Sequence, residues 1–365
     1  MSDSDLIRYG VIGTGMMGLE HIYNINAIDG GLVTAVSDPD DGSRAAGLDA
    51  ACQAADAPAK IGAFETHGEM LDSGLVDAVV IVSPNFTHRR ILDDVLTADV
   101  HTLIEKPMCT TVEDCKAVVD LAASSAKVTQ VGMEYRYMPP VARLISEVRN
   151  GSVGEPHMVA IREHRFPFLE KVGDWNRFSA NTGGTLVEKC CHFFDLMNMV
   201  MGTKPIRVMA SGGQNVNHLD EVYDGRIPDI LDNAFVIVDY PDGHRALLDL
   251  CMFAEATHNQ EEMSVVGPLG KVEAFLPTSV FKSGRRGEHF VGNVEIENVH
   301  DDTIAYEGLH HGSSYLEHVD FLAACRGERD IEVTVEDGLW AVAVGIAAHR
   351  SIDEGRIVEM TELGV

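Results

Sequence analysis

Short apolar runs alternate with amphipathic stretches over about the first 125 residues of the chain. The runs lie at residues 9–12, 33–37, 78–82 and 102–105, and a further strand is expected just beyond them at 128–133. The run at 78–82 is almost entirely β-branched, which is typical of a central parallel strand because both of its faces are buried. Strands that alternate with helices form a parallel sheet covered on both faces. The pattern therefore predicts an α/β fold for this part of the chain.

Two of the intervening stretches have clear helical character. One covers residues 86–98, and the other begins after Thr110 or Thr111 and ends near residue 125. A threonine side chain can cap the first backbone amides of the second helix. Glu113 and Asp114 in its first turn suit the positive end of the helix dipole.

Strand-like runs follow one another beyond Pro139 and Pro140. They lie at residues 157–163, 206–211, 234–240, 245–252, 262–266 and 271–276. Turns such as the one at residues 241–243 join neighbouring runs, and strands joined by tight turns form a mostly antiparallel sheet. We therefore predict a second region of the α+β class with a large, open sheet.

Helical spacing in the second region is confined to a few segments. One long helix is expected at about residues 185–201, with two more at about 314–326 and 335–354. A chain of 365 residues is too long for one typical core. We place the domains at residues 1–133 and 134–365, and leave open whether the last helix packs back on the first domain.

The composition is that of a globular protein with an acidic surface. There are 28 basic and 57 acidic residues, a net charge of −29, and such a surface repels nucleic acid and anionic membranes. No run approaches twenty apolar residues and the first five residues are polar, so we expect no membrane span, no signal peptide and a cytoplasmic location. The charge serves either ordinary solubility or adaptation to a saline cytoplasm.

Seven cysteines occur, an odd number with no C-x-x-C pair, which indicates a reducing compartment. The sequence Cys190-Cys191-His192 resembles part of a metal site. Adjacent helical side chains point about 100° apart, and no second pair of ligands is present. We therefore expect no metal site.

The first apolar run ends in the spacing Gly-x-Gly-x-x-Gly. Gly13 permits a tight turn, Gly15 lets backbone amides approach a pyrophosphate, and Gly18 lets the next helix pack closely on the strand. The second run ends in Asp38, twenty residues after Gly18, where a carboxylate would hold ribose hydroxyls and repel a 2′-phosphate. This combination favours NAD over NADP. The alternative is an ordinary glycine-rich turn.

Two segments carry side chains suited to acid–base chemistry. Glu188, His192 and Asp195 have the spacing of one helix face, so a carboxylate could orient the imidazole and stabilise its protonated form. Lys106 follows the run at 102–105, where a partly desolvated ammonium could polarise a substrate oxygen. The alternatives are a surface histidine paired with an acid and a solvated loop lysine.

Five motifs in this order resemble the Gfo/Idh/MocA oxidoreductases, the glucose-fructose oxidoreductase and inositol dehydrogenase family. They are the glycine motif at 13–18, Ser83-Pro84-Asn85 with His88, Glu105-Lys106-Pro107, the stretch 183–195, and Glu336-Asp337-Gly338-Leu339. The resemblance covers almost the whole chain. It implies an N-terminal Rossmann domain, a C-terminal α+β domain with an active site between the two, and homodimers or homotetramers formed through the open sheet.

The resemblance also implies site residues. Lys106 would lie beside the nicotinamide, and His192 would act as acid/base with Glu188 as its partner. The cofactor would be held by Gly13, Thr14, Gly15, Met16, Met17, Gly18, Asp38, Ser83, Pro84, Asn85, His88, Glu105 and Lys106. Two positions depart from the family pattern. Family members often have Asp where Glu188 stands, and a small or apolar residue is commoner than Lys189, which we expect to pair with a neighbour.

The substrate side is less sharply defined by sequence. Aromatic residues with hydrogen-bonding neighbours suit a polyhydroxylated ring, although they also occur at structural interfaces. The expected substrate-binding residues are Arg136, Tyr137, Arg162, His164, Trp175, Arg177, Lys189 and His192.

We therefore expect an NAD-dependent dehydrogenase that oxidises a secondary alcohol of a cyclic polyol or sugar, with His192 as acid/base and Lys106 assisting. One alternative is a redox-neutral glycosidase or epimerase that retains NAD and oxidises its sugar only transiently. The other is a non-catalytic regulator that senses NAD or sugar.

Overall fold

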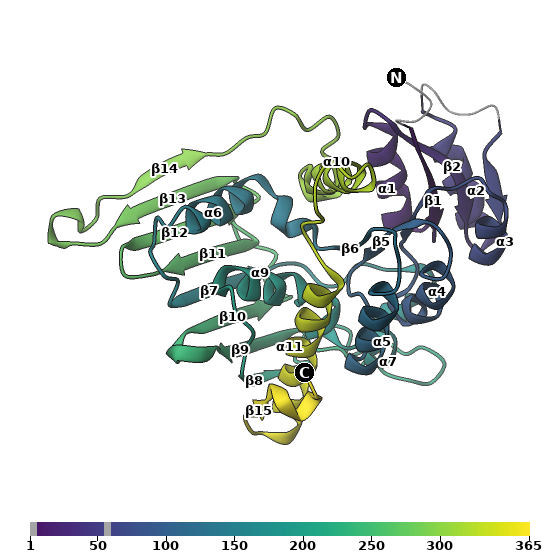
Figure 1. Cartoon of the computed structure of the whole chain (residues 1–365). Helices are drawn as coiled ribbons and strands as arrows, with labels where there is room; N and C mark the ends of the chain where they lie inside the picture. The colour runs from purple at the N-terminus through teal and green to yellow at the C-terminus, as the bar shows by residue number, and fades with distance from the viewer. Residues whose placement is uncertain (1–5, 55–59) are drawn as a thin grey trace. The chain divides into compact units, whose positions relative to one another are not determined.

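The structure, a computed structural model, describes residues 6–54 and 60–365. The chain forms two compact units. The first contains Met1–Glu134, Lys171–Gly173 and Asp302–Leu339. The second contains Tyr135–Glu170, Asp174–Asp301 and Trp340–Val365. Each unit is built around a sheet of its own (Figure 1).

The first unit contains a six-stranded parallel sheet in the order β3-β2-β1-β4-β5-β6. Its strands are β1 (Ile7–Ile12), β2 (Gly31–Ser37), β3 (Gly62–Phe64), β4 (Ala78–Ile81), β5 (His101–Glu105) and β6 (Thr129–Gly132). All four residues of β4 are buried, as its β-branched sequence predicts for a central strand. The order reverses between β1 and β4, so the carboxyl ends of these two strands border the crevice where such sheets bind ligands.

Among the described residues, five α-helices connect successive strands of this sheet: α1 (Met16–Asn26), α2 (Asp41–Ala51), α3 (His67–Asp72), α4 (His88–Val95) and α5 (Val112–Ala122). A further helix of this unit, α10 (Ser313–Cys325), comes much later in the chain. The Thr111 side chain caps α5 by accepting a hydrogen bond from the Asp114 amide at 3.1 Å, so one of the two predicted caps is confirmed. Helix α10 packs on α1, and Phe321 joins the apolar core beneath β1 and β2.

The second unit contains a nine-stranded sheet in the order β14-β13-β12-β11-β7-β10-β9-β8-β15. Its strands are β7 (Met158–His164), β8 (Arg207–Gly213), β9 (Asn233–Asp239), β10 (Arg245–Cys251), β11 (Glu261–Val266), β12 (Gly270–Leu276), β13 (Val280–Arg285), β14 (Glu295–Asn298) and β15 (Val358–Glu359). Only β7 and β10 pair in parallel; the other neighbours are antiparallel. The predicted fold class is therefore confirmed for both sheets.

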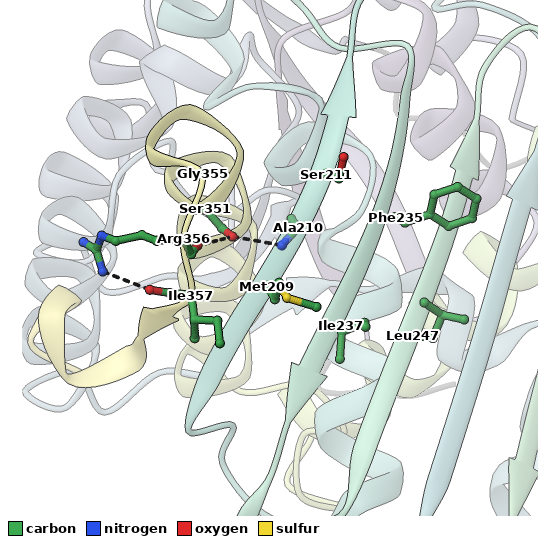
Figure 2. Close-up of a pocket in the computed structure, with 10 residues that line it drawn as sticks. All are labelled: Met209, Ala210, Ser211, Phe235, Ile237, Leu247, Ser351, Gly355, Arg356 and Ile357. Carbon is green, nitrogen blue, oxygen red and sulfur yellow. Dashed lines mark hydrogen bonds between the residues drawn. The ribbon is translucent and has the colours of Figure 1, made fainter.

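One face of this second sheet is covered and the other is open. Helices α6 (Pro139–Arg149) and α9 (Cys191–Met201) contact its strands. Along β7, β9 and β10 buried residues alternate with more exposed ones, which is the pattern of a sheet with one covered face. The open face holds a hollow of about 630 Å³ on β8, β9 and β10, lined mainly by apolar side chains (Figure 2).

Several elements differ from those predicted. The helix expected at 185–201 is two helices, α8 (Thr185–Glu188) and α9, separated at Lys189 and Cys190. Helix α6 was not predicted, because the pattern beyond Pro139 and Pro140 was interpreted as a succession of strands; the two prolines occupy the first turn of the helix, where proline is tolerated. Strands β3, β13, β14 and β15 were also not predicted.

Helix α7 (Ser179–Thr182) precedes α8, and α11 (Val335–Glu354) matches the last predicted helix. None of the helices in the described part of the chain combines the length and apolar character that a membrane span requires.

Candidate functional site

The glycine motif forms the turn between β1 and α1. Gly13 has φ +92°, and a Cβ there would lie 2.8 Å from the Ser83 backbone nitrogen. A Cβ on Gly18 would lie 2.1 Å from the Gly13 carbonyl oxygen, so any side chain would force the helix away from the strand. A Cβ on Gly15 would meet nothing within 4 Å. Two glycines therefore shape the turn, and the third leaves open space beside it.

Asp38 fixes the turn from the end of β2. Its Oδ2 accepts hydrogen bonds from the Thr14 amide (2.8 Å) and hydroxyl (3.3 Å), and its Oδ1 accepts from the Asp40 amide (2.9 Å). Arg44 donates to the Asp38 carbonyl at 2.6 Å and pairs with Asp41. Thr14 is buried, whereas Met16 is 42% exposed at the start of α1 and Met17 is half-buried.

These residues fit a dinucleotide. The first turn of α1 contains no acidic residue, and no side chain caps its amides, so these N–H groups suit a pyrophosphate. The open space at Gly15 lets the ligand approach the backbone. The Asp38 carboxylate keeps further lone pairs for ribose hydroxyls. NAD is therefore compatible with the turn that the structure contains.

The His88 ring contacts both the loop after β4 and the loop after β5 in the first unit. Its Nδ1 lies 2.9 Å from the Pro107 carbonyl oxygen and its Nε2 lies 2.8 Å from the Ser83 carbonyl oxygen. The Ser83 hydroxyl contacts the Thr87 hydroxyl at 2.7 Å, and Asn85 is buried in the 3-10 turn after Pro84. The loops that follow β4 and β5 are thereby held as one structure.

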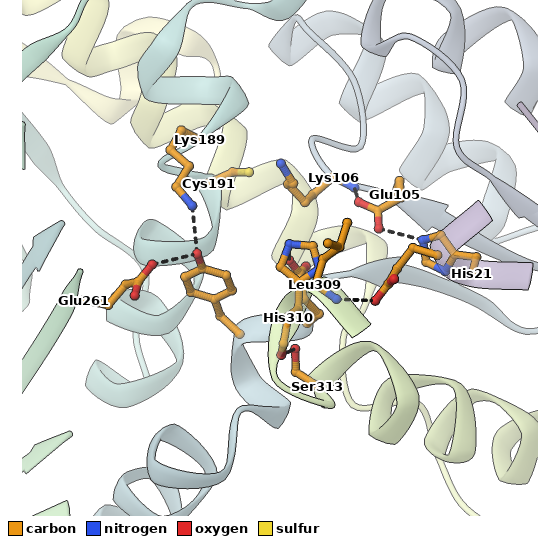
Figure 3. Close-up of polar contacts among 12 residues, drawn as sticks. His21, Glu105, Lys106, Lys189, Cys191, Glu261, Leu309, His310 and Ser313 are labelled. Atoms are coloured by element: carbon orange, nitrogen blue, oxygen red, sulfur yellow. Dashed lines mark hydrogen bonds and ion pairs between the residues drawn. The ribbon is translucent and has the colours of Figure 1, made fainter. Parts of the chain in front are cut away.

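Glu105 and Lys106 stand at the carboxyl end of β5. Glu105 is buried, accepts a hydrogen bond from His21 Nε2 at 2.9 Å, and accepts another from the Lys106 amide at 2.9 Å (Figure 3). Burial opposes ionisation of Glu105, but the His21 hydrogen bond and the charges of His21, Lys106 and His310 outweigh it and hold its pKa well below the ordinary value. An ionised Glu105 therefore orients the Lys106 backbone.

His192 lies in the first turn of α9 and is buried. Tyr135 stacks flat on it, with ring centroids 4.3 Å apart and an interplanar angle of 10°. Lys189, in the break between α8 and α9, donates to the Tyr135 hydroxyl at 2.7 Å and pairs with Glu163 at 3.0 Å. The predicted pairing of Lys189 with a neighbour is therefore what the structure contains.

The break between the helices changes the expected relation among Glu188, His192 and Asp195. Glu188 ends α8 and is buried, whereas His192 and Asp195 belong to α9. Asp195 accepts two hydrogen bonds from Arg136, at 2.7 Å and 2.6 Å, with both side chains buried. One continuous helix face does not exist here, and Arg136 is engaged by Asp195.

Other expected substrate-binding residues are spread over the second unit. Arg162 pairs with Glu262 at 2.5 Å and His164 with Asp249 at 3.1 Å. Both alternate along β7 with Glu163, which faces the covered side, so they lie on the open face. The structure does not bring these two residues together with Lys189.

Three further residues have distinct surroundings. Arg177 is buried and pairs with Glu221 at 3.0 Å, while Trp175 is half-buried in the same 3-10 segment. Tyr137 is half-buried at the end of the 3-10 turn Glu134–Tyr137.

Potential metal ligands converge at one place among the described residues. Glu155, His157 and His244 bring ligand atoms within 4.8 Å of one another. The His157 Nδ1 and His244 Nε2 are 2.8 Å apart, a hydrogen-bond distance, and Glu155 is exposed. Cys190 and Cys191 are both buried cysteines.

Two buried acids near Lys189 were not predicted. Glu163 lies between Arg162 and His164 in sequence, and Glu261 begins β11. The two residues are directly opposite each other across the β7 and β11 ladder. A covered-face Glu at an alternating position of a strand is a detectable signal, because charged residues are rarely buried without partners.

Comparison with known proteins agrees with this geometry. A family model described as the oxidoreductase family, NAD-binding Rossmann fold, matches residues 7–133, and one for the C-terminal alpha/beta domain of the same family matches residues 145–360. Myo-inositol 2-dehydrogenase of Thermotoga maritima is 27% identical over 98% of this chain and 99% of its own length. Inositol 2-dehydrogenase 1 of Saccharopolyspora erythraea is 26% identical over 97% and 96%.

A solved structure of levoglucosan dehydrogenase in complex with NADH and levoglucosan superposes with a TM-score of 0.82 at 17% identity, covering 97% of this chain and 99% of that one. This likeness concerns the fold. Since the two family models together account for most of the sequence, the chain belongs to the Gfo/Idh/MocA family of NAD-binding oxidoreductases.

Proposed function

We propose that the protein oxidises a secondary alcohol of a cyclic polyol or sugar, with NAD as the hydride acceptor. The observation that carries this proposal is the similarity to myo-inositol 2-dehydrogenase of T. maritima along nearly the full length of both chains. Similarity that extends over the C-terminal region supports a related substrate class, because the substrate-binding residues expected from the family resemblance lie in that part of the chain.

His192 is the acid/base in this proposal. As the C–H hydride leaves the substrate carbon, an imidazole nitrogen of His192 accepts the hydroxyl proton and a carbonyl forms. Bound NAD supplies the hydride acceptor, and the products are a ketone or lactone, NADH and a proton. The flat stacking of Tyr135 on the ring supports this role, since it restricts the orientation of the imidazole.

Lys106 is the second catalytic group. Its backbone is held by Glu105 at the carboxyl end of β5, the edge of a parallel sheet where ligands bind. Its ammonium stabilises negative charge that develops on the substrate oxygen as the proton leaves. We keep Glu188 as a further candidate in the catalytic set, because it is a buried carboxylate close in sequence to His192.

Cofactor choice depends on Asp38. A carboxylate that accepts ribose hydroxyls repels the 2′-phosphate of NADP. Arg44, the nearest candidate for a phosphate-binding residue in the sequence, is engaged with the Asp38 carbonyl and Asp41. We therefore propose NAD as the working cofactor.

The test is NADH formation at 340 nm with a panel of inositols, aldoses and sugar acids. We expect at least one cyclic polyol or sugar to be oxidised with NAD and more slowly with NADP. His192→Asn and Lys106→Met should each lower kcat about 10²- to 10⁴-fold and leave NAD binding nearly unchanged. Full activity of the His192 variant would refute its assignment as the base.

A redox-neutral reaction is the second candidate, and one relative favours it. A protein of Escherichia coli named 2,7-anhydro-N-acetylneuraminate hydratase is 24% identical over 67% of this chain and 61% of its own length. A hydratase produces no net NADH, so product formation without a change at 340 nm would favour this candidate over net oxidation.

We further propose that copies of the chain associate through the open face of the nine-stranded sheet. Phe235 is 60% exposed and Met209 46% exposed on neighbouring strands, and contiguous apolar surface of this kind marks an interaction site. We also retain Arg136, Tyr137, Arg162, His164, Trp175, Arg177 and Lys189 as candidates for substrate binding, to be tested by their effect on KM.

A further inference from the structure

The ring of His192 stacks on the ring of Tyr135, and the Tyr135 hydroxyl both accepts and donates a hydrogen bond. The Tyr135 hydroxyl accepts a hydrogen bond from Lys189 Nζ at 2.7 Å and donates one to Glu261 Oε1 at 3.2 Å (Figure 3). Tyr135, Lys189 and Glu261 are all more than nine-tenths buried. The orientation of the tyrosine ring therefore depends on the charges of two buried side chains.

Glu261 faces a second buried acid. It pairs across the ladder with Glu163, which is fully buried, and Lys189 Nζ and Arg165 Nη1 lie 3.0 Å and 3.2 Å from Glu163 Oε1. Two carboxylates thus face two cations on the covered side of β7 and β11. When all four are ionised, their charges sum to zero.

The net charge of these four side chains depends on the protonation state of Glu261. Burial, together with the neighbouring Glu163 carboxylate, raises the pKa of Glu261 to about 7, although Lys189, Arg165 and the Tyr135 hydrogen bond act in the opposite direction. Above that pH the four groups are neutral in sum. Below it Glu261 takes up a proton and the same groups carry one positive charge.

We propose that Tyr135, Lys189, Arg165, Glu163 and Glu261 form a positioning cluster that holds the His192 ring and couples its protonation to that of Glu261. The proposal rests on the proposed function of His192. Tyr135 is the connecting element, since it touches His192 through its ring and both charged partners through its hydroxyl. Neither Tyr135 nor Glu261 is assigned a bond to the substrate.

The direction of the coupling follows from charge. With Glu261 ionised, an imidazolium at His192 forms beside a neutral cluster and on the electron-rich face of Tyr135. With Glu261 protonated, the imidazolium forms beside a net positive charge, which disfavours it. His192 is therefore the stronger base above about pH 7, and oxidation should accelerate through that range.

The test follows His192 directly by NMR of ¹³C-labelled histidine, with His192→Asn identifying the resonance. We expect the wild-type resonance to respond to two ionisations, its own and one near pH 7. In Glu261→Gln the second response should vanish and the His192 pKa should fall. Glu262→Gln is the matched control, because the neighbouring Glu262 alternates to the open face and pairs with Arg162.

Steady-state kinetics provide a second test of the proposal. Glu261→Gln should lower kcat/KM roughly three- to tenfold at pH 8, change it little at pH 6 and leave KM nearly constant. Tyr135→Phe keeps the stacked ring but loses both hydrogen bonds, so it should weaken the same coupling. Glu261→Asp, which retains a carboxylate, should restore part of the pH dependence if the variants are folded, as checked by thermal unfolding.

The outcomes separate this inference from the proposed function. A His192 titration in Glu261→Gln identical to that of the wild type would overturn the coupling whatever the enzyme's activity. Coupling observed by NMR in a protein that oxidises no polyol or sugar would support the cluster and refute the proposed reaction.

Discussion

Glu317 shows how strongly burial acts on single residues of this chain. It is fully buried in α10, and neither carboxyl oxygen has a hydrogen-bond partner among the described residues. Burial first, and then the charges of Glu134, Glu105 and Asp320, raise its pKa well above the ordinary value. Folding therefore favours the neutral acid form of this side chain.

This state makes the folded protein less stable as pH rises. Below the unfolded-state pKa of about 4.3 both states hold the proton; above it only the unfolded state releases it, until the folded pKa is reached. We predict that Glu317→Gln stabilises the protein relative to wild type by an amount that grows with pH above the unfolded-state pKa, by at most about 1.4 kcal/mol per pH unit. Urea unfolding at pH 5, 6.5 and 8 measures this difference.

The exposed Glu328, which follows the same helix, provides the control. Glu328→Gln should show the pH dependence of the wild type. A stability difference between Glu317→Gln and wild type that stays constant across the three pH values would contradict a raised pKa of Glu317.

Site residues at the ends of strands can be identified from the sequence more easily than site residues that become neighbours only when two distant strands pair. Asp38 and Lys106 could be identified because each directly follows an apolar strand. The partners of Lys189 could not, since Glu163 and Glu261 become neighbours only through the pairing of β7 with β11. No local pattern encodes that register.

Among the elements, the turn between β1 and α1 separates two uses of glycine. At Gly15 a side chain meets no protein atom within 4 Å, whereas at Gly18 it collides with the Gly13 carbonyl. We predict that Gly15→Ala keeps the unfolding temperature nearly unchanged but weakens NAD binding at least about tenfold, or about 1.4 kcal/mol. Gly18→Ala should weaken NAD binding and also lower the unfolding temperature.

Calorimetric titration with NAD and thermal unfolding distinguish these effects. Gly68→Ala, at another glycine whose Cβ meets nothing within 4 Å, is the control and should leave NAD binding unchanged. Wild-type NAD affinity in Gly15→Ala would show that the dinucleotide does not pass over this turn.

Elements with clear periodicity were predicted and those without it were not. The buried strand β4 and the helix α11 were found from their apolar spacing. Strand β14 was not predicted because all four of its residues are exposed, and β3 was not predicted because it has only three residues. The break at Lys189 lies inside a continuous helical pattern, so tertiary contacts rather than local preference decide it.

At the scale of the whole molecule, the open sheet face leads to a prediction about assembly. Phe235 and Leu247 project from neighbouring strands beside the hollow shown in Figure 2 and are 60% and 38% exposed. Exchanging both for Glu adds charge to an interface without disturbing a protomer's core. We predict that wild type sediments as a dimer or tetramer and that Phe235→Glu/Leu247→Glu sediments as a smaller species.

Val291→Glu tests whether any added surface charge has this effect, because Val291 is 87% exposed and lies outside the hollow. It should sediment as wild type does. A wild-type protein that is monomeric at micromolar concentration would refute association through this face.

The excess of 29 negative charges also acts on the molecule as a whole. Folding brings these charges closer together than in the unfolded chain, so their mutual repulsion destabilises the compact state. Salt shortens the Debye length from about 10 Å at 0.1 M to about 3 Å at 1 M. We predict that the unfolding temperature rises by several degrees between 0.05 and 1 M KCl and then levels off, as screening saturates.

Thermal unfolding in KCl measures this change in unfolding temperature, with an uncharged osmolyte as control. A rise that continues to several molar, with loss of folding in dilute buffer, would instead indicate adaptation to a saline interior.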